Sequence, residues 1–247
     1  MKQYEALLTQ YQAGEREQVW QALRDMGAAV WEPDVYPTAW AVCELACRRI
    51  RRNIETMIDC LTGVGYRFAD PNHPAKQSQC PFYPADERSR RYADWLKQQI
   101  GPFGMLTSAY ICLVGDVDLN GTHQRWQDEF LPIDPLVIEF EGRRYHEDPR
   151  ARLVEEYADY QDEREDGEPF HLAFAPDALT KANISGGTAF AVLTPFAGID
   201  PMLDLDGESM SLVAYLNQCF SAKCFRFAEK EGEHGFLESL AVDLLLI

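Results

Sequence analysis

The 247-residue chain lacks the features that would place it in a membrane or a secretory pathway. It has no apolar run close to the ~20 residues that a helix needs to cross a bilayer. Its first eight residues, Met-Lys-Gln-Tyr-Glu-Ala-Leu-Leu, lack the apolar stretch and small-residue cleavage site of a signal peptide. We therefore expect a cytoplasmic protein that does not bind membranes.

A disulfide framework is also missing from the sequence. Seven cysteines are an odd count, spread over a long chain with no secretory signal, which favours reduced thiols. Cys43 and Cys47 lie four apart in a helical pattern, which is typical of buried thiols that pack as small hydrophobes. Cys219 and Cys224 are five apart, with no second Cys/His pair nearby to complete four zinc ligands. We expect unpaired, mostly buried thiols and no structural zinc.

No motif in the chain specifies a catalytic centre. The five histidines are scattered, without a His-Glu-x-x-His or Gly-x-Ser-x-Gly pattern. The run from Asp116 to Gly121 matches the first half of a calcium loop, but the twelfth position is Gln127, which cannot supply the bidentate carboxylate. The same run also fits a strand that enters an Asn-Gly turn. The sequence therefore predicts no catalytic residue, no metal and no cofactor.

Positive charge is scarce in the second part of the chain. Residues 1–85 carry nine Lys/Arg against ten Asp/Glu, whereas residues 86–247 carry fourteen against thirty, within a net charge of −17. A negative field of this size repels nucleic-acid phosphates and anionic lipid, and it attracts basic partners. The alternative is that the acidity serves solubility alone. We expect no nucleic-acid binding.

The densest acidic stretch is Asp159–Glu168, in which six of ten residues are acidic. Unpaired charges are costly to bury, so this stretch should be exposed. Its central acids, Asp162, Glu163, Glu165 and Asp166, are the residues that we expect to bind a partner.

A short basic cluster interrupts this pattern in the first part of the chain. Arg48, Arg49, Arg51 and Arg52 resemble a nucleic-acid patch when taken alone. The cluster is short and its segment is neutral overall. A solvated helix face, or a face docked on the acidic second part, is therefore the favoured interpretation.

The hydrophobic pattern predicts a helical first part over residues 1–68. Apolar residues at three-and-four spacing predict two helices, or one broken helix, over residues 3–27, with Gly14 as the interruption. A longer helix should begin with Thr38 as its N-cap and end at Gly63 or Gly65. Residues 69–85 hold four prolines and no periodic pattern, which predicts an extended linker.

The remaining residues, 86–247, should form the second domain. Helices are expected over about 86–99, 104–114, 149–160 and 209–223, with Ser209 as a possible cap of the last. Short strands are expected at 117–119, 136–140, 170–174 and 189–193. This order predicts an α+β fold, in which a mainly antiparallel sheet is flanked by helices and preceded by a helical segment.

Three stretches of this second part resemble the SUKH superfamily, which includes fungal cell-wall-assembly regulators and bacterial immunity proteins. They are Trp95–Leu119, with Tyr110 and Gly115 at positions typical of the family, Phe170–Gly187, and the helical stretch Leu212–Phe220. The resemblance covers about residues 86–247 and departs from the family where Gly104-Met105 replaces a Leu-Pro turn. It implies an α+β protein-binding scaffold and assigns no catalytic residue.

Together, the charge and the resemblance favour a non-enzymatic interaction module, more specifically an immunity protein that neutralises a basic toxin. Charge complementarity would raise the association rate and the specificity of such a complex. One alternative is an enzyme that uses a pocket between the helical part and the sheet. Another is a structural partner subunit. The sequence leaves the oligomeric state open.

Overall fold

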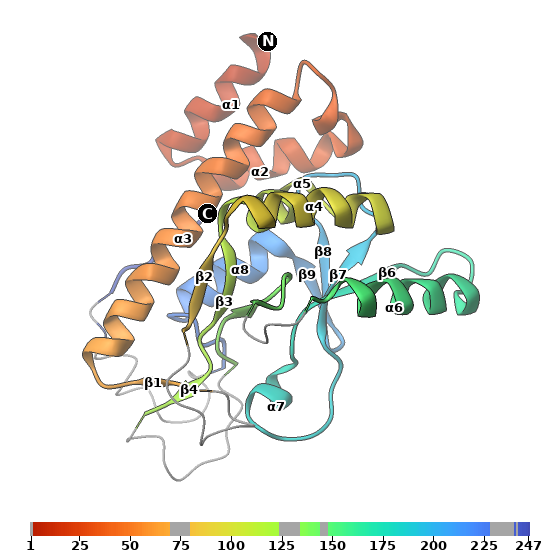
Figure 1. Cartoon of the computed structure of the whole chain (residues 1–247). Coiled ribbons are helices and arrows are strands. Elements are labelled where there is room, and N and C mark those ends of the chain that lie inside the picture. Colours follow the sequence, from red (N-terminus) through yellow and green to blue (C-terminus); the bar gives the residue numbers. More distant parts are fainter. Residues whose placement is uncertain (1, 70–79, 124–133, 144–147, 228–239, 241) are drawn as a thin grey trace.

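The computed structural model describes residues 2–69, 80–123, 134–143, 148–227, 240 and 242–247. Within these residues the chain forms eight α-helices and nine short strands, and every pairing between the named strands is antiparallel (Figure 1). The predicted α+β class, with an N-terminal helical segment, is confirmed.

Two helices and a short 3-10 turn precede the longest helix. They are α1 (Lys2–Ala13), α2 (Arg16–Asp25) and η1 (Gly27–Trp31). Gly14 separates α1 from α2 with a φ of +104°, a backbone conformation that favours glycine. The expected interruption at this residue is therefore confirmed, and α2 buries Trp20 and Leu23 in the core.

The long helix α3 (Tyr36–Gly63) follows the expected periodicity but begins three residues earlier than predicted, with Val35 and not Thr38 at the N-cap position. Pro37 lies in its first turn, where the fixed φ of proline fits a helix and its missing N–H costs nothing. Thr38 is therefore inside the helix and is not its cap. Beyond the C-terminal end, Gly65 takes a φ of +88°, which turns the chain away from the helix axis.

Two further helices lie beside α3. They are α4 (Glu87–Ile100) and α5 (Met105–Leu113), and α5 contacts both α3 and α4. A capping box starts α4: the Asp86 carboxylate accepts the Ser89 N–H at 3.3 Å, and the Ser89 hydroxyl accepts the Asp86 N–H at 3.1 Å. Because most of α5 is apolar and buried, it forms the central layer between its neighbours.

Two small sheets follow from pairings between segments far apart in the chain. One joins β1 (Arg67–Phe68) to β4 (Gly121–Thr122), and the other has the order β2 (Phe82–Pro84), β3 (Gly115–Asp118), β5 (Val137–Ile138). The strand at Gly115–Asp118 confirms the expected strand, but the Asn-Gly turn after it does not join paired strands. The expected linker over 69–85 is not a linker throughout, because its last part forms β2 and pairs with β3. Phe82 lies opposite Val117 in this pairing, and its ring is buried.

The largest sheet lies in the second half of the chain. Its order is β6 (Phe170–Ala175), β7 (Phe190–Thr194), β8 (Met202–Leu205), β9 (Glu208–Ser211). The helices of this half are α6 (Arg150–Glu163), α7 (Ala178–Lys181) and α8 (Leu212–Ser221). Ser211, and not Ser209, caps α8, because residues 208–211 pair as β9 before the helix begins.

The buried apolar side chains form one continuous cluster that includes residues of α3, α5 and α8. Arg24 on α2 also donates to the buried carboxylate of Asp200 at 2.9 Å. At the other end of the chain, the amide of Asn53 on α3 exchanges two hydrogen bonds of 2.8 Å with the backbone of Leu245. The division into domains at 1–68 and 86–247 stays a prediction, and residues 70–79 of the expected linker lie outside the described residues.

The burial of the cysteines predicts their reactivity. All seven are free: Cys43, Cys47, Cys219 and Cys224 are buried, whereas Cys80 is exposed. Burial raises the pKa of the Cys219 thiol to about 12, which suppresses the reactive thiolate. Alkylation of the native protein, followed by mass spectrometry, should modify Cys80 first and the four buried thiols only after denaturation. Rapid native labelling of Cys43 or Cys47 would contradict this burial.

Candidate functional site

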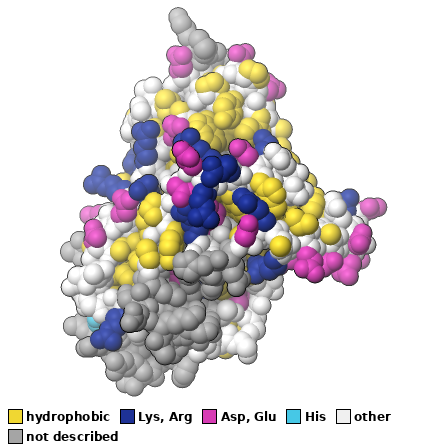
Figure 2. All heavy atoms as spheres, viewed as in Figure 1, with side chains coloured by type: hydrophobic (Ala, Val, Ile, Leu, Met, Phe, Trp, Pro, Cys, Tyr) yellow, Lys and Arg dark blue, Asp and Glu magenta, His cyan; other side chains and the backbone are white. Residues whose placement is uncertain are grey.

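The predicted partner-binding acids lie at the end of α6 and directly after it. Asp162 and Glu163 are the last two residues of the helix, and Glu165 and Asp166 follow in the turn. We call Asp159–Glu168 the acidic segment, and all six of its acids are exposed. Figure 1 shows α6 extending away from the body of the molecule, and Figure 2 shows acidic side chains gathered on this extension. The predicted exposure of the acidic segment is confirmed.

Aromatic packing attaches the inner face of α6 to the largest sheet. The rings of Tyr157 and Tyr160 lie 5.0 and 5.2 Å from the ring of Phe170 on β6, measured between centroids. Leu153 is buried one turn before Tyr157. The Tyr160 hydroxyl also donates to the backbone carbonyl of Glu168 at 2.6 Å, which ties the end of the acidic segment back to the helix. The apolar face therefore fixes the helix and leaves the carboxylates to solvent.

The first residue of α6 is held by α4. The guanidinium carbon of Arg150 lies 5.8 Å from the ring centroid of Tyr92 and 5.4 Å from that of Trp95. Such cation–π contacts favour a fixed position of the charged group over the rings. The two helices are thus connected at the base of the projection, where α6 leaves the body.

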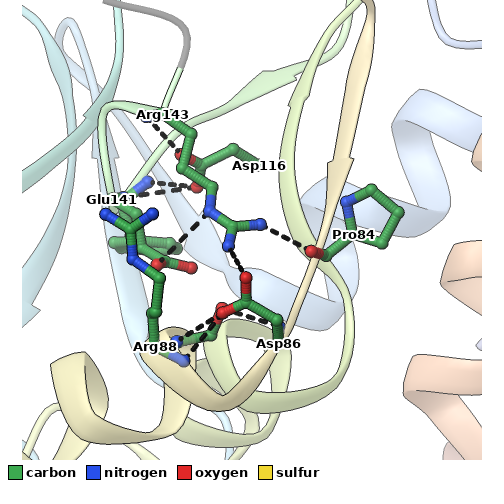
Figure 3. Close-up of polar contacts among 8 residues, drawn as sticks. Pro84, Asp86, Arg88, Asp116, Glu141 and Arg143 are labelled. Carbon is green, nitrogen blue, oxygen red and sulfur yellow. Dashed lines mark hydrogen bonds and ion pairs between the residues drawn. The ribbon is translucent and has the colours of Figure 1, made fainter. Parts of the chain in front are cut away.

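A charged network around Arg143 lies just before this helix in the chain (Figure 3). The Arg143 guanidinium donates to the Pro84 carbonyl at 2.6 Å, forms an ion pair with Asp86, and lies 3.6 Å from a carboxylate oxygen of Glu141. It therefore connects β2, the N-cap of α4 and the segment after β5. Its side chain is 16% exposed, so solvent screens these contacts only in part.

Asp116 on β3 holds the same segment through its backbone. One carboxylate oxygen accepts the N–H groups of Phe140 and Glu141 at 3.0 and 3.3 Å, and the other accepts the N–H of Arg143 at 3.1 Å. Burial raises the pKa of Asp116 to about 6, although these three hydrogen bonds act in the opposite direction. Because both oxygens are engaged, this carboxylate positions the loop and is poorly placed to act as a general base or as the first ligand of the calcium-loop motif.

A second charged cluster is buried beside the largest sheet. The Lys181 ammonium lies 2.5 Å from one oxygen of Asp134, and the Arg226 guanidinium lies 3.1 Å from the other. Arg226 also contacts Glu208 at 2.7 Å. The side chains of Asp134, Lys181 and Arg226 are at most 1% exposed, so each charge depends on the others for compensation.

The basic cluster on α3 is mostly paired within its own surroundings. Arg48 and Arg51 face Glu44 and Glu55 one helical turn away, at 3.8 and 2.8 Å. Arg49 donates to the carbonyl of Leu246 in the C-terminal tail at 2.7 Å. These contacts support the interpretation of a solvated helix face, part of which docks on the second part of the chain.

The two charged networks were not found by sequence reasoning. Asp134, Lys181 and Arg226 are far apart in the chain, and each looks like an ordinary surface residue in its local context. Asp116 was noticed only as part of a calcium-like run. Two acids, Asp116 and Asp118, in a stretch that also predicts a strand are the local signal of a structural role, because the structure buries this strand and unpaired buried carboxylates are costly.

The part of the chain that the structure describes contains no group of three or more acidic, histidine or cysteine side chains suited to hold a metal ion. Nor does any helix in these ranges have the length and apolar character to cross a bilayer. No family model, curated protein or solved structure matches the chain significantly. The structure itself therefore supplies the class: an α+β protein that presents an exposed acidic helix end.

Proposed function

We propose that the protein is a non-enzymatic, cytoplasmic interaction module that binds a basic protein through the acidic segment. The observation that carries this proposal is the contrast between the two faces of α6. Its inner face is fixed by Leu153, Tyr157 and Tyr160, whereas the six acids of the acidic segment are all exposed. An exposed segment in which six acids surround a single basic residue, Arg164, is suited to attract a partner of opposite charge.

The charge of the whole second part supports the same partner class. Residues 86–247 carry sixteen more acidic than basic residues, so the field around the molecule is negative well beyond the acidic segment. Such a field accelerates the encounter with a basic protein, and salt weakens it over a Debye length of ~8 to 10 Å. It also opposes binding to nucleic acids and anionic membranes.

We further propose that the basic partner is a toxin and that the protein is an immunity protein of SUKH type. The support is the resemblance of Trp95–Leu119, Phe170–Gly187 and Leu212–Phe220 to that superfamily. Toxins that degrade nucleic acids need a basic surface to approach phosphates, and a protein with an acidic surface can cover it. An immunity protein should also be encoded next to its toxin, which makes the neighbouring gene product the first partner to test.

Charge reversal tests the proposal directly. Replacing Asp162, Glu163, Glu165 and Asp166 with Lys should lower the association rate with a purified basic partner by about tenfold or more, because long-range attraction is reversed locally. Stability should change little, since exposed charges contribute little to folding. Stopped-flow or surface-plasmon-resonance measurements at several salt concentrations would give the rate and its salt dependence.

The matched control carries the same change in net charge at another place. Glu15, Asp25, Glu55 and Asp59 are exposed acids of the N-terminal helical region, so their replacement with Lys also raises the net charge by eight. This control should slow association much less than reversal of the acidic segment. An association rate that depends neither on salt concentration nor on charge reversal of the acidic segment would contradict the proposal. The acidic segment would then serve solubility alone.

A further inference from the structure

Three aromatic side chains form a row at the start of α3. The ring centroids of Trp31 and Tyr36 are 5.8 Å apart, and those of Tyr36 and Trp40 are 5.9 Å apart. The planes of neighbouring rings differ by only 23° and 26°, so each neighbouring pair is stacked. Tyr36 and Trp40 share one helix face because they are four residues apart. We call these three side chains the aromatic row.

The aromatic row is both fixed in place and partly open to solvent. The Trp31 indole N–H donates to the Ala197 carbonyl at 2.7 Å, and the Trp40 indole N–H donates to the Glu44 carboxylate at 2.9 Å. Tyr36, between them, is 37% exposed, and the two tryptophans are half-buried. Rigid, partly exposed tryptophan and tyrosine rings are the side chains that most often anchor protein interfaces.

The molecule already places one cation on this row. The Lys97 ammonium on α4 lies 4.4 Å from the ring centroid of Trp31. The surroundings also favour positive charge, because Glu32 and Asp34 are exposed and follow Trp31 closely in the chain. Residues 27–47 contain these two acids and Glu44, which already faces Arg48, and no Lys or Arg. Rings and carboxylates together are complementary to a cationic side chain.

We propose that the aromatic row, with Glu32 and Asp34, is a second contact for the basic partner and takes an arginine-bearing segment of it. Arginine fits better than lysine because its planar guanidinium stacks on rings and at the same time donates paired hydrogen bonds to carboxylates. The inference rests on the proposed function for the identity of the partner. The acidic segment then sets the association rate, and the aromatic row sets the lifetime of the complex.

The two contacts lie on either side of α4 (Figure 1). Lys97 near the end of α4 touches the aromatic row, and Tyr92 and Trp95 on the same helix touch Arg150 at the start of α6. The acidic segment lies at the other end of α6, which has 14 residues and is ~21 Å long, so the two contacts are separated by on the order of 20 to 30 Å, within the span of an ordinary protein–protein interface. One partner can therefore cover both contacts at once.

The experiment uses the full chain and a capped hexa-arginine peptide as the probe. Titration calorimetry should show that Tyr36→Leu and Trp40→Leu each weaken peptide binding about threefold to tenfold, the range expected for loss of one cation–π contact. Indole N–H signals of Trp31 and Trp40 should shift on addition of the peptide. A hexalysine peptide should lose less affinity in the same variants, because its ammonium groups stack less well. Thermal unfolding checks that each variant is folded.

Lys97 supplies a matched pair of variants. Lys97→Gln and Arg90→Gln each remove one positive charge from the exposed surface of α4, but only Lys97 lies on a ring of the row. The first should tighten hexa-arginine binding more than the second, because it also vacates the Trp31 ring. Equal effects of the two variants, or unchanged binding by Tyr36→Leu and Trp40→Leu, would overturn the inference.

The outcomes also separate this inference from the proposed function. If reversal of the acidic segment abolishes hexa-arginine binding while the ring variants have no effect, the inference fails and the proposed function stands. If the ring variants weaken binding while the reversal changes neither affinity nor salt dependence, the aromatic row is a cation site and the role of the acidic segment fails.

Discussion

Replacing Asp134 with Asn should lower the free energy of unfolding by about 3 to 5 kcal/mol, the cost typical of breaking a buried ion pair. The side chains of Lys181 and Arg226 are 0% and 1% exposed, and the substitution leaves both cations in the interior without their shared carboxylate. Asn is the replacement that changes the backbone least, because Asp134 has a φ of +41°, a conformation that Asn tolerates better than most residues. Urea unfolding followed by circular dichroism would measure the change.

An exposed ion pair gives the control for Asp134. Glu156 lies 3.1 Å from Arg152 on α6, with side chains that are 47% and 74% exposed. Glu156→Gln removes one carboxylate in the same way, yet it should cost less than about 0.5 kcal/mol because solvent screens the pair. Lys181→Met should lower the free energy of unfolding less in the Asp134→Asn variant than in the wild type. In that variant the substitution removes a buried charge that has already lost its partner. A loss below about 1 kcal/mol for Asp134→Asn would show that the cluster is not held by these charges.

The second large effect is a pH dependence that comes from Asp116. Burial raises the pKa of Asp116 from 3.8 to about 6 in the folded protein. Between these values the folded state holds a proton that the unfolded state has released, so stability falls as pH rises. The contribution of this group is fully present below pH ~3.8 and is lost as pH rises through ~6, by roughly 3 kcal/mol in total.

The comparison with Asp116→Asn isolates this contribution. The variant cannot titrate at residue 116, while the other carboxylates are common to both proteins. The stability advantage of the wild type over the variant should therefore fall by roughly 2 to 2.5 kcal/mol between pH 4 and pH 7, since part of the total of ~3 kcal/mol is already lost at pH 4. The carboxyl carbon signal of Asp116 should titrate with a midpoint near 6. A midpoint below about 4.5 would contradict the burial effect.

Local sequence signals located most helices and predicted that the acidic segment is exposed to solvent. Apolar spacing placed α3, α4 and α5 to within a few residues, because a helix is stabilised by contacts between residues three and four apart. Its exact ends were harder to place, as the start of α3 at Tyr36 and of α8 at Leu212 show. The exposure of the acidic segment followed from composition, since six carboxylates with a single basic residue among them are too costly to bury.

Strand partners and buried charges depended on the tertiary structure. β2 pairs with β3, and β1 pairs with β4, across long stretches of chain. Strands this short carry too little alternation of polar and apolar residues for the sequence to predict their partners. The Asp134–Lys181–Arg226 cluster likewise joins Asp134 to residues that are 47 and 92 positions away in the chain. The sequence by itself determined most of the helices and the sign and place of the exposed charge, because these depend on near neighbours and on solvation. Only the folded chain decided which strands pair and which charges are buried together, because those free energies arise from contacts between distant residues.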